Sequence, residues 1–115
     1  MQRTPTHFNI GNRFLLDKKI GMGGFGEVYM AKDSTTGKNC AVKMESRVAG
    51  MPVLNYEFKI LQHLKNLEGV PQVYKFGLQG DFNWMAMQYI GYSVEHYHSA
   101  CHRIFSLEVR FFVEN

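Results

Sequence analysis

The strongest constraint on the fold is a glycine run, Gly21-Met22-Gly23-Gly24-Phe25-Gly26, which lies between two segments of alternating polar and apolar residues. The run fits the pattern GxGxxG, which alone is a weak signal because unrelated nucleotide-binding loops and ordinary turns share it. In a dinucleotide-binding fold the third glycine opens a helix, whereas Gly26 is followed by the alternating residues 27–30. We therefore predict that the glycine loop joins two strands.

The other strands are predicted from the same alternation and from turn residues. Strands are expected at 14–20, 27–32, 39–45, 73–78 and 84–89, with turns at 33–38 and 79–81. From Pro52 the apolar spacing changes to three and four residues, which predicts one main helix whose inner face carries Leu54, Glu57, Phe58, Leu61 and Leu64. The sequence thus predicts an α+β fold with a five-stranded antiparallel sheet and one main helix.

Composition limits the class of protein. The 115 residues are 45% hydrophobic and 20% charged, which fits one globular domain, and the net charge of +3 indicates neither a nucleic-acid nor a membrane partner. Cys40 and Cys101 form no CxxC pair, and no apolar run resembles a signal peptide or a membrane span. We expect an intracellular protein, cytoplasmic or nuclear or both.

A second element, Ala41-Val42-Lys43, follows the glycine loop. In a strand, Ala41 and Lys43 share a face, so the small side chain leaves room for a ring while the ammonium reaches a phosphate. Glu57, the single acid in the apolar stripe of the helix, is placed to be the counter-ion of Lys43, because an unpaired buried carboxylate is costly. Backbone N–H groups of the glycine loop can face polyphosphate oxygens, and Val28 can press on a purine.

In this order, the glycine loop, the Ala41-Val42-Lys43 element and Glu57 resemble the N-terminal lobe of a eukaryotic protein kinase, from about Phe14 to the last residue. Four runs resemble the casein kinase I family, including its tau-tubulin kinase relatives: Lys43-Met44-Glu45-Ser46, Asn83-Trp84-Met85-Ala86-Met87, Ser93-Val94-Glu95 and Cys101-His102-Arg103-Ile104-Phe105-Ser106-Leu107. Gly24 and Gln88 are closer to the tau-tubulin branch and residues 69–71 and 93–95 to casein kinase I proper, so the branch stays open. Tyr92 and His96 stand where the casein kinase I pattern has proline and aspartate.

The resemblance implies ATP under the glycine loop, Lys43 on the α- and β-phosphates, Glu57 orienting Lys43, and Met87 as gatekeeper. Lys43 and Glu57 are the catalytic residues that the chain would contribute. The implied ATP-binding set is Ile20, Gly21, Met22, Gly23, Gly24, Phe25, Gly26, Val28, Ala41, Lys43, Met87 and the hinge residues Gln88, Tyr89 and Ile90. The implied organisation is a polar lead-in at 1–12, a kinase N-lobe with its hinge at 13–90, and a truncated start of the C-lobe with incomplete helices at 91–115.

The motifs that complete phosphoryl transfer in kinases do not occur in the sequence. Neither HRDxxxxN nor DFG is present, since Cys101-His102-Arg103-Ile104 lacks the aspartate and Asp81-Phe82-Asn83 reads as a turn. We therefore expect the chain to be an ATP-binding portion, inactive alone, of a serine/threonine kinase that transfers the γ-phosphoryl to protein substrates. Mg²⁺ ligands are expected only in the missing C-lobe, with no metal ligand in this chain. The alternative is a non-catalytic kinase-derived lobe that acts as a binding module.

Overall fold

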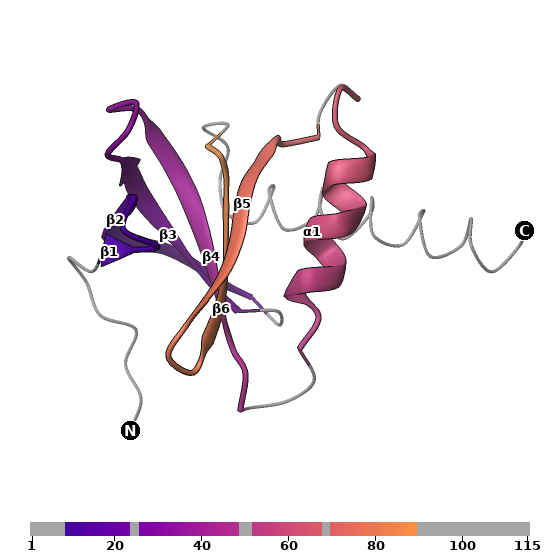
Figure 1. The fold of residues 1–115 in the computed structure, drawn as a ribbon, viewed down its shortest axis with the longest axis horizontal. Coiled ribbons are helices and arrows are strands. Elements are labelled where there is room, and N and C mark those ends of the chain that lie inside the picture. Colours follow the sequence, from indigo (N-terminus) through magenta and orange to yellow (C-terminus); the bar gives the residue numbers. More distant parts are fainter. Residues whose placement is uncertain (1–8, 24–25, 49–51, 68–69, 90–115) are drawn as a thin grey trace, which may run out of the picture.

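A computed structural model describes residues 9–23, 26–48, 52–67 and 70–89. In this part of the chain, one helix packs against a six-stranded, wholly antiparallel sheet with the order β1-β2-β3-β4-β6-β5 (Figure 1). The elements are β1 Asn9–Ile10, β2 Phe14–Gly23, β3 Gly26–Asp33, β4 Asn39–Ser46, α1 Leu54–His63, β5 Val73–Gln79 and β6 Phe82–Gln88. The α+β fold and the glycine loop between two strands are confirmed, and the strand that begins at Gly26 rules out a helix-opening dinucleotide loop.

The prediction of five strands was wrong, because the sheet has six. The additional strand, β1, lies in the segment that we expected to be a polar lead-in. Gly11 and Asn12 both adopt positive φ, at 61° and 55°, so the chain reverses tightly and Ile10 pairs with Phe14. Ile10 is fully buried. A two-residue strand is too short to produce an alternating pattern. Its apolar residue, Ile10, packs in the core.

The sheet has apolar residues on both faces. One face carries a core of Ile10, Phe14, Leu16, Tyr29, Ala31, Cys40, Val42, Met44, Trp84 and Ala86. The other carries Val28, Ala41, Met85 and Met87, which pack with Leu54 and Leu61 of α1. Successive residues of a strand point to opposite faces, so β4 contributes alternately to the two cores. Helix α1 therefore covers the face that includes Ala41, and it lies beside β5 in Figure 1.

The face without the helix is closed by the two ends of the sheet itself. The Gln79 side chain accepts a hydrogen bond from the Gly11 N–H (3.0 Å) and donates one to the Asn9 carbonyl (3.2 Å), which joins β5 to the β1–β2 turn. Trp84 lies beneath this junction, where a Cβ at either Gly11 or Gly77 would overlap its ring. Two glycines thus let the backbone approach the largest side chain of the core.

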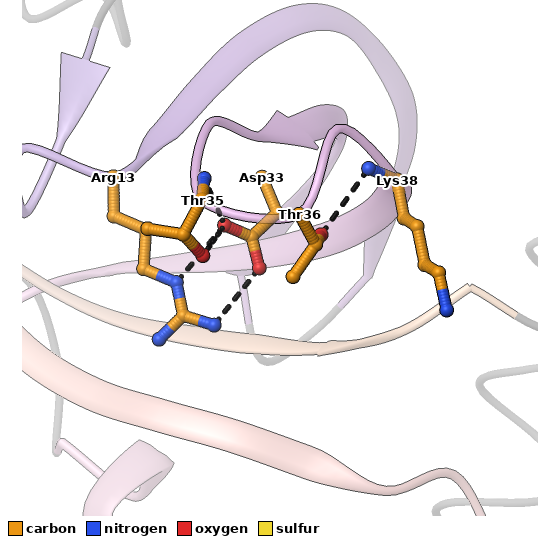
Figure 2. Close-up of polar contacts among 5 residues, drawn as sticks. All are labelled: Arg13, Asp33, Thr35, Thr36 and Lys38. Carbon is orange, nitrogen blue, oxygen red and sulfur yellow. Dashed lines mark hydrogen bonds and ion pairs between the residues drawn. The ribbon is translucent and has the colours of Figure 1, made fainter.

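The β3–β4 turn is fixed by one buried carboxylate. Asp33 accepts hydrogen bonds from Arg13 Nε (3.0 Å) and Nη2 (2.9 Å), and from the Thr35 N–H (2.9 Å) and hydroxyl (2.7 Å) (Figure 2). The Lys38 N–H donates to the Thr36 hydroxyl (3.2 Å) within the same turn. The hydrogen bonds from Arg13 hold the pKa of Asp33 well below its usual range. Helix α1, the helix among the described residues, is too short and too polar to cross a membrane.

Candidate functional site

A buried ion pair joins the sheet to the helix. Lys43 Nζ lies 3.1 Å from Glu57 Oε1 and 3.0 Å from Glu57 Oε2, so the ammonium contacts both carboxylate oxygens. The two side chains are 4% and 11% exposed. Charges removed from water to this extent are stable only when paired, and the pair is therefore a fixed feature of this face of the sheet.

Local sequence explains why these two side chains meet. Lys43 lies in β4, in register with Val28 of β3 and Met85 of β6, on the face that α1 covers. Glu57 lies in the first turn of α1, three residues after Leu54, and both side chains are buried. The predicted pairing of Lys43 with Glu57 is confirmed.

Other predicted residues gather on the same face. Val28 pairs with Gly21 on one side and Lys43 on the other, and Ala41 pairs with Met87. Ile20 lies next to Gly21 at a register shift of β2 and packs against this apolar cluster. The face therefore combines one buried cation with a surrounding surface of Val28, Ala41, Met87 and Ile20, of which the first three are almost fully buried.

The glycine loop connects β2 to β3 at the end of this face. Met22 pairs with Glu27 and Gly23 pairs with Gly26, so the pairing of β2 with β3 continues almost to the tip of the hairpin. Gly26 has a φ of 132°, and a Cβ at this position would overlap the Met44 carbonyl oxygen. The third glycine of the motif is thus required by close contact with β4. Gly24 and Phe25 lie outside the described residues.

A polar brace holds the hairpin. Tyr29 donates its hydroxyl proton to Glu27 Oε2 (2.7 Å), and Lys19 Nζ lies 3.3 Å from Glu27 Oε1. Lys19 and Tyr29 are partners in the β2–β3 register. The three side chains therefore tie β2 and β3 together next to the glycine loop, with Lys19 before the loop and Glu27 and Tyr29 after it.

The predicted hinge begins at the end of β6. The Gln88 N–H donates to the Gln72 carbonyl (2.7 Å), and the Gln88 side-chain oxygen accepts from the Gln72 N–H (3.2 Å). The Gln88 N–H therefore already donates a hydrogen bond within the fold. Tyr89, which follows the strand, is exposed. Ile90 and the predicted start of the C-lobe at 91–115 lie outside the described residues.

Two functional candidates were missed by sequence analysis. Glu45 and Asn83, both buried, form a 2.9 Å hydrogen bond from Asn83 Nδ2 to Glu45 Oε1. Glu45 Oε2 also accepts from the Val53 N–H (2.7 Å) and the Leu54 N–H (3.0 Å). Glu45 stands two residues after Lys43, on the same strand face, and that spacing was the one available signal.

A pocket lies away from the ion pair, at the end of α1 and the start of β5. Its lining residues are Lys59, Gln62, His63, Lys65, Gln72 and Val73. None of the described residues that we predicted to hold ATP is among them. Within the described ranges, His, Cys, Asp and Glu side chains form no cluster of three that could hold a metal ion. No protein-family model matches the chain.

Proposed function

We propose that this chain is the ATP-binding portion of a casein kinase I-like serine/threonine protein kinase. The observation that carries the proposal is the buried Lys43–Glu57 pair. Lys43 is in register with Val28, the second residue after the glycine loop. A buried ion pair is a poor way to stabilise a domain, because apolar side chains of similar volume do as well or better. Its presence beside the apolar side chains of Val28, Ala41 and Met87 is therefore better explained by a ligand that needs a fixed cation.

The residues present fit a nucleoside triphosphate. Glu57 fixes the Lys43 ammonium at the sheet face, where it would contact the α- and β-phosphates. At the end of the hairpin Gly23 pairs with Gly26, and neither residue has a side chain that would hinder a phosphate near the backbone. Val28, Ala41 and Met87 supply the apolar side chains that a purine would contact. Bound ATP supplies the γ-phosphoryl group, whose transfer to protein hydroxyls we assign to the complete kinase with Mg²⁺.

Equilibrium titration of the 115-residue chain with ATP tests the proposal. The wild-type chain, a Lys43→Met variant and a Lys59→Met variant are compared by calorimetry, with circular dichroism as the check on folding. Lys59 is an exposed lysine of α1, so Lys59→Met removes the same charge away from the site. We expect ATP binding by the wild-type chain and by Lys59→Met, and an affinity at least about tenfold lower for Lys43→Met, the loss expected for one charge-assisted contact. Equal affinity in all three proteins, or no binding by any, would refute the proposed role.

A further inference from the structure

Helix α1 begins without a capping side chain of its own. Its N-cap residue is Val53, with φ −123° and ψ −6°, and an aliphatic side chain cannot accept a hydrogen bond from the first N–H groups. Serine, threonine, aspartate or asparagine usually occupies this position. The first turn of α1 therefore depends on an acceptor from elsewhere in the fold.

Glu45 of β4 supplies that acceptor. Its Oε2 accepts from the N–H groups of Val53 (2.7 Å) and Leu54 (3.0 Å), so one carboxylate oxygen satisfies two N–H groups at the helix start. Its Oε1 accepts from Asn83 Nδ2 of β6 (2.9 Å). Glu45 is 7% exposed, and the partial positive charge of a helix N-terminus favours a carboxylate there.

The Glu45 cap and the Lys43–Glu57 pair form two adjacent links between the same strand and the same helix. Lys43 and Glu45 are two residues apart in β4, a separation of roughly 6.6 Å along a strand. Leu54 and Glu57 are three residues apart in α1, a rise of roughly 4.5 Å. The Glu57 N–H donates to the Val53 carbonyl (3.0 Å), which places Glu57 in the turn that Glu45 caps.

We propose that Glu45 is a positioning residue: it holds the first turn of α1 on β4 and thereby sets the contact between Glu57 and Lys43. Without the cap, the first turn frays, and Glu57 leaves with it because its own N–H bond to Val53 belongs to that turn. Lys43 then gains access to water. The importance of this link for ATP binding rests on the proposed function, whereas its effect on Lys43 does not.

The chemical accessibility of Lys43 tests the inference in the 115-residue chain without nucleotide. Reductive methylation with formaldehyde and borohydride is followed lysine by lysine with mass spectrometry, and exposed Lys59 is the internal reference. Glu57→Gln, which removes one charge from the ion pair, is the positive control. Asp33→Asn is the matched control, because it makes the same acid-to-amide change at another buried carboxylate, one bound to Arg13 and Thr35 rather than to α1.

We expect Lys43 to react about tenfold faster in Glu45→Ala, the factor that loss of an N-cap produces. In Glu45→Gln the amide oxygen still accepts but the charge is lost, and we expect a rate about threefold above wild type. Asp33→Asn leaves the Lys43 rate unchanged. If Glu45→Ala is unfolded, all lysines accelerate together and Glu45→Gln decides the question.

A Lys43 rate in Glu45→Gln that equals the rate in Asp33→Asn would overturn the inference. The result is independent of the proposed function: failure of the wild-type chain to bind ATP leaves the Lys43 rates as a valid test of the link. Binding of ATP together with unchanged Lys43 rates would retain the proposed function and remove the role of Glu45.

Discussion

Removing one member of the Lys43–Glu57 pair should destabilise the domain far more than removing both. In Lys43→Met the Glu57 carboxylate stays buried without the Lys43 ammonium, and in Glu57→Leu the ammonium loses its carboxylate. The side chains are only 4% and 11% exposed, so solvent offers little compensation. Separating a buried pair in this way costs about 3–5 kcal/mol in the free energy of unfolding. This cost is a large share of the free energy of unfolding of a typical domain, which is about 5–15 kcal/mol.

The double variant Lys43→Met/Glu57→Leu removes both charges and fills the space with apolar groups. We expect it to be within about 1 kcal/mol of wild type, because apolar replacement of a whole buried pair is close to neutral. Together with the single variants it gives a double-mutant cycle whose coupling energy should exceed about 3 kcal/mol. Such a result means that the charges are not retained for stability.

Urea unfolding followed by tryptophan fluorescence measures these differences. Trp84 is the only tryptophan of the chain, and it is buried in the core on the sheet face opposite Lys43. Its emission therefore reports on unfolding of the sheet and not on the altered site. Exposed Lys59→Met serves as the control and should change stability by less than about 0.5 kcal/mol. A cost below about 1 kcal/mol for each single variant, or additive costs in the double variant, would refute the reasoning.

Two further predictions concern the parts of the fold that support the site. Arg13 lowers the pKa of Asp33, so the Asp33 carboxylate contributes stability above about pH 4 and loses this contribution as the pH falls further. The difference in Tm between wild type and Asp33→Asn should therefore shrink between about pH 4 and pH 2. A difference that stays constant over this range would contradict the assignment. Gly26→Ala should unfold at clearly lower urea than Gly37→Ala, because both glycines have positive φ but only a Cβ at Gly26 overlaps backbone, at the Met44 carbonyl. Equal midpoints for the two variants would show that the close contact with β4 is unimportant.

The spacing of apolar residues in the sequence was sufficient to predict the long strands and the helix. The strands around the glycine loop, the strand of Lys43 and the helix of Glu57 are confirmed, because each extends over at least eight residues, which is long enough for the spacing of its apolar residues to indicate its type. The pairing of Lys43 with Glu57 could be predicted for the same reason, since a buried acid and a buried lysine on facing elements need each other.

Features that depend on contacts between distant residues could not be predicted in this way. Strand β1 is formed by the Gly11–Asn12 turn and by the burial of Ile10, and two residues carry no period. The sequence analysis assigned Glu45 no role of its own, and only the three-dimensional structure places its carboxylate at the start of α1. Likewise, Gly77 has no local reason to be glycine until Trp84 is seen against it.

The most direct test of the central claim is to identify the lysine that an ATP-derived acyl phosphate modifies. Such a reagent places its electrophile at the phosphates of the bound nucleotide, so it acylates the lysine that contacts them. We predict that peptide mapping of the labelled 115-residue chain finds the acyl group on Lys43, that excess ATP prevents the labelling, and that Glu57→Gln reduces the protection by ATP. Labelling confined to exposed lysines such as Lys59, at a rate that ATP does not change, would contradict the assignment of this face as a nucleotide site.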